Sequence, residues 1–424
     1  MKLIKTSFFS AIITFIRIIS GFLSGKIVAM YTGPAGVALI GQFTNFISIV
    51  LTFANGAINS GVIKYTAEYE EDEIKLKKLF STSIRISVFC SMVFGTILVT
   101  LSSYITYILF KSDLYYNPIR VLGITIILYS LNSLLISILN GLKEIKKYTI
   151  VNTIGSIIAL IFTVILVFYY KIQGALYALV LTQSIVFFIS LICVLKSSWF
   201  RWSYFSQSFD KDIAVKLSQF SLMTIVSMLC APVAQIVLRN LLISKLGVDS
   251  AGYWQGMMRI SDGYLMLVTT SLSTYYLPKL SALKSNKELR VEIFQGYKII
   301  LPFVFICCLA IYLLRFFIIN LLYTSDFQSM SNLFFYQLLG DFFKIAAWLL
   351  AFLMMAKSMT KIFVISEVIF SISYILLSFL CVNLFQLKGI AIAFAINYFF
   401  YFLIMIIIFR KLLFCKKREI ENFN

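Results

Sequence analysis

Long apolar segments constrain this chain more than any other feature. The first is Phe8–Tyr31, and about eleven more follow at intervals of roughly 30–40 residues. Each is close to the ~20 residues that an α-helix needs to cross a bilayer. We therefore predict an all-α polytopic membrane protein with about 12 transmembrane helices. The expected spans lie near residues 8–31, 36–60, 84–110, 118–141, 149–170, 173–195, 217–244, 250–278, 298–322, 331–356, 361–383 and 388–412.

Three sequence matches indicate that the chain is an internal duplication. The matching positions are Ala35-Gly36 with Ala251-Gly252, Lys147 with Lys361, and Gly174 with Gly389. Together they give an internal repeat of about 215 residues, and many secondary transporters are built from such repeats, with a binding site where the repeats meet. We therefore expect two six-helix bundles, residues 1–196 and 217–424, joined by a cytoplasmic linker at residues 197–216.

The positive charge of the chain follows its loops. Residues are 60% apolar, mean hydropathy is +0.93, and 37 Lys and Arg against 18 Asp and Glu give a formal charge of +19. One set of alternate loops, with both termini, holds 25 of the basic residues, and the other set holds four. This bias predicts cytoplasmic termini by the positive-inside rule. The basic excess then reflects topology and anionic lipid, so nucleic acid is not an expected partner.

Histidine and cysteine argue against an enzyme or a metalloprotein. The chain has no histidine, and its seven cysteines show no C-x-x-C spacing. Histidine-based acid–base chemistry and histidine metal ligands are excluded, and no disulfide framework is indicated. We expect no cofactor, no metal site and no catalytic residues.

Basic side chains within the expected spans are candidates for substrate binding. A charge at the bilayer midplane costs at least ~2.5–3.5 kcal/mol. Arg17 lies about nine residues from either end of its span, where it is least able to reach the interface, so we expect it to face a cavity. Lys26 and Arg239 lie nearer the outer ends, and for them snorkelling to the interface and function both remain open.

Acidic side chains within the spans occur only in the second half. Arg259 and Asp262 are spaced i, i+3, and Asp341 and Lys344 repeat that spacing, so each pair can share one helix face. Each is either a self-neutralising pair or a site that exchanges its partner during transport. Glu367 has no counter-charge in its own span and is a candidate proton carrier, with a structural hydrogen bond as the alternative.

Charge therefore differs between the halves. The first half has deep bases and no deep carboxylate, which suits an anionic substrate by Coulomb attraction away from water. A cation exporter should show the opposite balance.

Six segments resemble the Wzx-type polysaccharide flippases (O-antigen and lipid III branches) of the MOP exporter superfamily. They cover both halves in order: GKIVAMYTGPAG (Gly25–Gly36), GVIKYTAEY (Gly61–Tyr69), YWQGMMRISDGYL (Tyr253–Leu265), YYLPKLS (Tyr275–Ser281), YQLLGDFFK (Tyr336–Lys344) and ISEV (Ile365–Val368). The resemblance implies two six-helix bundles around a cavity lined mostly by the first, second, seventh and eighth helices.

The resemblance also implies a function. The expected substrate is an oligosaccharide on undecaprenyl pyrophosphate, moved from the inner to the outer leaflet of the bacterial inner membrane by alternating access. A coupling ion (H⁺ or Na⁺), a glycan polymerase and a chain-length regulator are the implied partners. We assign substrate binding to the cationic residues Arg17, Lys26, Arg239 and Arg259. We assign ion coupling or gating to Asp262, Asp341, Lys344 and Glu367.

Two rival functions stay open at this point. A multidrug or cation antiporter of the MATE type would use the same fold, but the deep bases of the first half argue against it. A membrane glycan polymerase usually needs a sizeable external loop with catalytic groups, and the expected external loops are short.

Overall fold

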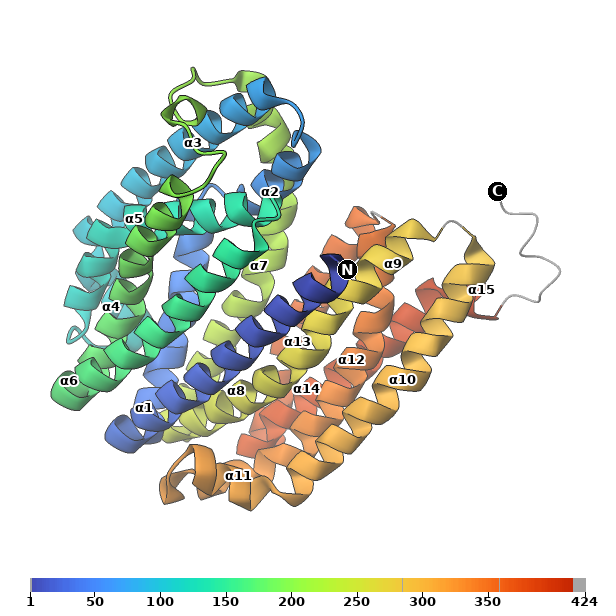
Figure 1. Ribbon diagram of the computed structural model, residues 1–424. Helices are drawn as coiled ribbons and strands as arrows, with labels where there is room; N and C mark the ends of the chain where they lie inside the picture. The colour runs from blue at the N-terminus through green and yellow to red at the C-terminus, as the bar shows by residue number, and fades with distance from the viewer. Residues whose placement is uncertain (1, 284, 358, 415–424) are drawn as a thin grey trace. The chain divides into compact units, whose positions relative to one another are not determined.

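The computed structural model describes residues 2–283, 285–357 and 359–414. These residues form helices joined by short turns, and no strand occurs among them, which confirms the all-α prediction (Figure 1). The chain separates into two compact units, with the boundary between Ile236 and Val237. The predicted bundle limits at residues 196 and 217 stay a prediction.

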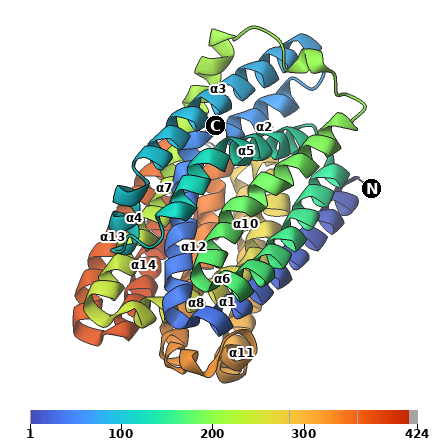
Figure 2. The ribbon, with the colours of Figure 1, turned by 90° about the vertical axis from the view of Figure 1, so that its left-hand side faces the viewer.

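The first unit is built around long antiparallel helices. Helix α6 packs along both α1 and α5, and α5 packs along α3 (Figure 2). The elements of this part of the chain are α1 (Lys2–Ala54), α2 (Asn59–Glu68), α3 (Glu73–Thr100), α4 (Ser102–Phe110), α5 (Tyr116–Gly141), α6 (Ile145–Leu195), η1 (Trp202–Tyr204) and α7 (Lys211–Leu246), whose last ten residues belong to the second unit.

The second unit repeats this pattern of packed helices. Helix α12 packs against α14 and α10, and α13 packs against α14. Its elements are α8 (Val248–Ser271), the π-helical turn η2 (Leu272–Tyr276), α9 (Leu277–Ala282), α10 (Asn286–Leu313), α11 (Arg315–Leu322), η3 (Ser325–Leu333), α12 (Phe334–Ala356), α13 (Thr360–Phe385), α14 (Leu387–Ile408) and α15 (Arg410–Phe414).

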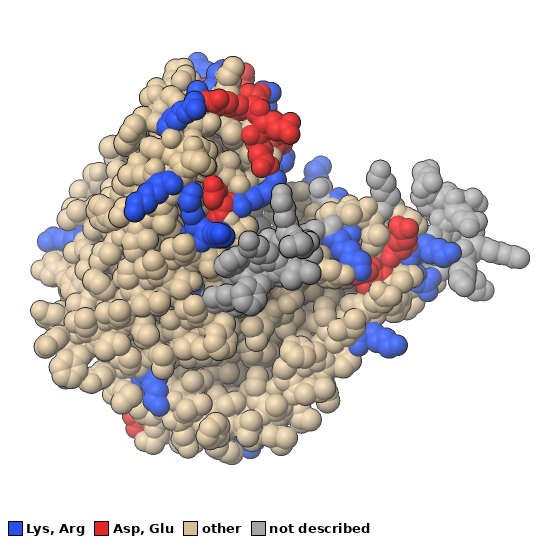
Figure 3. Space-filling model, in the orientation of Figure 1, with Lys and Arg blue, Asp and Glu red and all other residues tan. Residues whose placement is uncertain are grey.

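The predicted spans are all found as helices. Nine described ranges are long and apolar enough to cross a membrane. Two of them, within α1 and α6, each hold two expected spans, and the remaining expected span, 250–278, is carried by α8 and the short elements after it. The chain is therefore a multi-pass membrane protein. The surface agrees with this conclusion: in Figure 3, charged side chains gather at one end of the first unit, and uncharged residues cover most of this face.

The backbone confirms the internal repeat. Helix α6 breaks at Lys171 (φ 48°, ψ −124°), and one repeat later in the sequence Gln386 (φ 51°, ψ −132°) separates α13 from α14. Helix α1 breaks at Gly33 (φ 63°), before Pro34, and one repeat later Gly247 (φ 87°) precedes α8. Left-handed backbone is costly for residues other than glycine, so matching breaks at one period reflect duplication of one fold.

The glycines that follow the two non-glycine breaks pack alike. A Cβ on Gly174 would lie 1.8 Å from the carbonyl oxygen of Leu166, and a Cβ on Gly389 would lie 2.1 Å from that of Cys381. Leu166 and Cys381 are separated by the same interval as the two glycines. Each helix hairpin is thus closed by a glycine that lies directly on the preceding helix.

Candidate functional site

A buried carboxylate lies at the centre of a polar cluster in the second unit. Asp341, on α12, is fully buried. The Ser261 hydroxyl on α8 lies 2.7 and 2.6 Å from its two oxygens and donates its single proton to one of them. Tyr264 Oη donates to Asp341 at 2.8 Å, and Gln337 Nε2 lies 3.4 Å away. Neutral donors on two helices therefore hold this carboxylate, as buried polar groups require.

One lysine lies beside this carboxylate and faces aromatic rings. Lys344 is one turn further along α12 and is only 9% exposed. Its Nζ lies 4.9 Å from the ring centroid of Trp348, 5.9 Å from that of Phe394 and 5.7 Å from that of Tyr398. Such cation–π contacts replace part of the hydration that burial removes.

The charge of Lys344 acts on three carboxylates. Asp262 on α8, Asp341 on α12 and Glu367 on α13 each interact electrostatically with this ammonium group. The structure therefore brings together all four residues to which we assigned ion coupling or gating. Tyr398 on α14 lies within electrostatic range of the same three carboxylates.

The carboxylates differ in how firmly they are held. Glu367 is half-buried and is approached by Tyr401 Oη at 3.5 Å, which is long for a hydroxyl hydrogen bond. Asp262 is exposed near the middle of α8. Among the described residues, neither Arg259–Asp262 nor Asp341–Lys344 forms a direct ion pair.

Arg239 is buried inside the second unit. Its side chain is fully buried on α7, its guanidinium donates to Gln255 Oε1, and its central carbon lies 5.6 Å from the Trp254 ring. Arg239 thus ties α7 to α8 through partners within the protein. Its assignment to substrate binding stays a prediction.

The other candidate cations lie on α1 and α8. Arg17 is exposed in the first half of α1, and its charge reaches the Tyr129 hydroxyl on α5. Lys26 is half-buried further along α1, well before the break at Gly33. At 3.6 residues per turn the side chains of Arg17 and Lys26 point to opposite faces. Arg259 is half-buried on α8, and its charge reaches Tyr323.

Sequence reasoning missed the uncharged members of the cluster. Ser261 and Tyr264 flank Asp262 within the segment Tyr253–Leu265, and Trp348 and Tyr398 look like ordinary apolar or interfacial residues. The one available signal was spacing, because Gln337, Asp341 and Lys344 recur at i, i+4 and i+7 on one face of α12.

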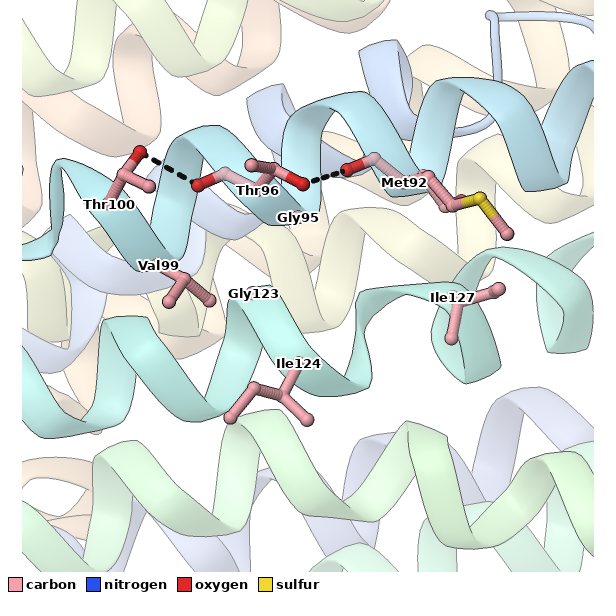
Figure 4. Close-up of a pocket in the computed structure, with 9 residues that line it drawn as sticks. Met92, Gly95, Thr96, Val99, Thr100, Gly123, Ile124 and Ile127 are labelled. Atoms are coloured by element: carbon pink, nitrogen blue, oxygen red, sulfur yellow. Dashed lines mark hydrogen bonds between the residues drawn. The ribbon is translucent and has the colours of Figure 1, made fainter.

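A separate groove between α3 and α5 is apolar. It has a volume of about 470 Å³ and is lined by Ser91, Met92, Gly95, Thr96, Val99, Thr100, Gly123, Ile124 and Ile127 (Figure 4). The Thr96 and Thr100 hydroxyls donate to carbonyls of their own helix at 2.8 Å. With no charged residue in its lining, the groove suits hydrocarbon and cannot serve as the ionic site.

Comparison with known proteins identifies the family. Residues 10–332 match the model of the family described as "Polysaccharide biosynthesis protein". The chain is 31% identical to the lipid III flippases of Escherichia coli (strain K12) and Shigella flexneri over 373 residues, which is 87% of this chain and 88% of each relative. The chain therefore belongs to this polysaccharide biosynthesis family, and both of these relatives are named as flippases.

Solved structures share the fold. An inward-facing multidrug resistance MATE family transporter of the MOP superfamily aligns with a TM-score of 0.81 and 14% identity over 96% of each chain. A MOP superfamily transporter from Pyrococcus furiosus, described as having a binding pocket of reverse polarity, aligns with a TM-score of 0.69 and 14% identity over 94% of this chain and 96% of the other. At such identities the likeness shows the fold alone.

Proposed function

We propose that this protein is a flippase for an oligosaccharide linked to undecaprenyl pyrophosphate. The observation that carries the proposal is the 31% identity to lipid III flippases over 87% of the chain. Substrate enters from the cytoplasmic leaflet of the bacterial inner membrane and leaves in the outer leaflet by alternating access. Both termini are cytoplasmic, and a glycan polymerase and a chain-length regulator act on the product.

Arg17 engages the pyrophosphate in this proposal, and Lys26, on the opposite face of α1, adds positive charge along the same helix. Arg17 is exposed although it lies deep within an expected span. Hydrocarbon is an unfavourable environment for a guanidinium, which favours contact with water or with an anionic ligand. A guanidinium forms two parallel hydrogen bonds with a phosphate, which an ammonium group cannot do. Arg239 and Arg259 remain candidate substrate-binding cations within the second unit.

The polar cluster of the second unit couples transport to an ion gradient. Neutral donors hold Asp341 in place, whereas Asp262 and Glu367 have weaker restraints and are the groups that exchange H⁺ or Na⁺. Lys344 supplies the counter-charge that keeps several carboxylates tolerable at membrane depth.

The experiment is complementation of a strain that lacks the gene. We expect the deletion to accumulate single lipid-linked units in the inner leaflet and to lose surface glycan. Wild-type protein and Arg120→Ala, which changes an exposed arginine near a span end, should restore export. Arg17→Ala should not, at equal protein level, and Arg17→Lys should restore it in part.

Other outcomes would select the rivals. Lipid-linked units that reach the outer leaflet unpolymerised would indicate a polymerase. Intact glycan with raised drug sensitivity would indicate an antiporter. Normal export by Arg17→Ala would remove this residue from the site while leaving the flippase function in place.

A further inference from the structure

We propose that the segment between α6 and α7, residues 196–210, is a membrane-surface anchor that binds anionic phospholipid headgroups. Most of this anchor segment falls within the cytoplasmic linker that was predicted at residues 197–216. Its contacts, its exposed tryptophan and its charge together point to a lipid surface as its partner, and the proposal does not depend on what the protein transports.

The anchor segment is fastened to the start of α3. Ser81 Oγ donates to the Tyr204 carbonyl at 3.0 Å, and the Gln207 N–H donates to Ser81 Oγ at 3.0 Å. Lys78 forms an ion pair with Asp210 at 3.0 Å. These contacts span the segment from its middle to its end, so the segment is held as part of the first unit and its conformation is already fixed before any lipid binds.

Aromatic side chains pack the inner side of the segment. Phe80 of α3 lies 6.0 Å from Trp199, 5.9 Å from Tyr204 and 5.8 Å from Phe205, measured between ring centroids. Tyr204 is 9% exposed. This small aromatic core gives the segment a fixed inner face and thus defines an outer one.

The outer face of the segment presents the indole of Trp202, which does not pack in this aromatic core. Trp202 is 73% exposed and, among the rings that the structure describes, touches only the edge of Phe200, with centroids 5.3 Å apart. A large amphipathic ring held outward by a rigid turn is suited to the boundary between headgroups and acyl chains, where tryptophan is enriched.

Two helices place this indole at that boundary. Helix α6 exposes Phe188, Ile192 and Leu195 by 53%, 50% and 40%, and the anchor segment begins at the next residue. On α3, the attachment at Ser81 comes two turns before Phe89, which is 69% exposed. The segment therefore starts where the apolar outer surface of the first unit ends.

The exposed charged side chains of the anchor segment are basic. Glu73 lies 2.8 Å from Lys77, and Asp210 is paired with Lys78, so these two carboxylates already have lysine partners. The Arg201 side chain is 72% exposed, and its Nη1 lies 3.8 Å from Glu73 Oε1, so this ion pair is a long one. Lys196 is also exposed. Exposed basic side chains beside an interfacial tryptophan favour anionic over zwitterionic headgroups.

The test is fluorescence quenching by brominated lipid, with the full-length protein in vesicles. The chain has four tryptophans, so the signal of Trp202 is the difference between wild type and Trp202→Phe. We use phosphatidylcholine vesicles that contain phosphatidylglycerol, with bromine near the headgroup end of the acyl chains of one lipid or the other. We expect the difference signal to be quenched, and more strongly when bromine is on phosphatidylglycerol.

A charge variant checks the headgroup preference. In Lys196→Gln combined with Arg201→Gln, quenching should become equal for the two brominated lipids, while circular dichroism stays unchanged. Equal quenching of wild type and Trp202→Phe, or strong quenching of the difference signal by aqueous iodide, would show a solvated indole and overturn the anchor. Equal quenching by both lipids in the wild type would overturn the anionic preference.

Discussion

Replacement of Gly174 by alanine should strongly destabilise the helix hairpin that α6 forms. The chain turns back at Lys171, and Gly174 then lies directly against the preceding helix. An alanine Cβ there would be 1.8 Å from the carbonyl oxygen of Leu166 and 2.4 Å from its carbonyl carbon. Both atoms belong to the backbone, so no side chain can rotate away, and the two helices must separate along their contact.

The size of the effect follows from two opposing contributions. Alanine in place of glycine within a helix normally stabilises by about 0.5–1 kcal/mol. Overpacking that forces backbone shifts costs typically about 1–3 kcal/mol and more where the backbone itself is struck. Because the overlap is with backbone atoms, the cost lies at the top of that range, and after the helix gain we expect a net loss of about 2 kcal/mol.

Thermal unfolding of the purified protein in detergent measures this loss. Gly389→Ala repeats the perturbation in the second unit, with a Cβ 2.1 Å from the Cys381 carbonyl oxygen. Gly21→Ala is the matched control, because a Cβ on Gly21 of α1 meets nothing within 4 Å. We expect Gly174→Ala and Gly389→Ala to melt well below wild type and Gly21→Ala at or above it. A melting temperature of Gly174→Ala equal to that of wild type would refute the reasoning.

Further predictions concern three side chains. Tyr264→Phe removes a hydroxyl that donates to the buried Asp341 carboxylate at 2.8 Å. Hydrogen bonds to charged groups contribute about 1.5–3 kcal/mol, so ion-driven flipping in proteoliposomes should fall at least tenfold while the protein still folds. Asp210→Ala should raise hydrogen exchange at the start of α7 by removing an N-cap, a loss of about 1 kcal/mol, and Asp210→Asn should raise it less. The pKa of Asp210 is held below its usual value, first by a backbone N–H in the first turn of α7 and then by Lys78. The stabilisation of α7 by the Asp210 carboxylate should therefore be constant above about pH 4, the ordinary aspartate pKa, and should disappear as pH falls through the lowered pKa. Loss of this stabilisation at about pH 6, above the ordinary pKa, would contradict the prediction. Arg239→Met removes the donor to Gln255 Oε1 and should lower the melting temperature, because a buried group that loses its hydrogen bond costs about 1–3 kcal/mol; export that survives at equal protein level would show a structural role only.

Hydropathy and charge pattern carried the prediction of the fold. Apolar length defines most spans, because a helix in lipid must satisfy its own backbone. Helix α8 is the exception. It carries Asp249, Arg259 and Asp262 and is absent from the nine apolar ranges found in the described part of the chain. The span predicted at residues 250–278 was placed by its apolar character like the others, and the match of Ala35-Gly36 with Ala251-Gly252 agrees with that placement independently.

The orientation of side chains within the membrane could not be predicted. In a soluble protein an apolar stripe marks the buried face of a helix, but here lipid-facing and protein-facing residues are equally apolar. For Arg239 both snorkelling and substrate binding were open; its side chain is fully buried beside Trp254 and donates to Gln255, and its part in substrate binding stays a prediction. The donors Ser261 and Tyr264 were missed for the same reason, since only helix rotation and packing bring them to Asp341.

The two units share a backbone but differ in the chemistry of equivalent positions. Counting back one repeat from Asp341 and Lys344, at the interval that separates Gly174 from Gly389, gives Ile126 and Tyr129 on α5. In the second unit this part of the helix presents a carboxylate and an ammonium group to Asp262 and Glu367, whereas in the first unit Tyr129 feels the charge of Arg17. The position held by Lys344 in one repeat therefore lies near carboxylates, and the equivalent position, Tyr129, lies near the guanidinium of Arg17. Duplication therefore kept the turns of the scaffold, at Lys171 and Gln386, while the charges at equivalent helix positions diverged.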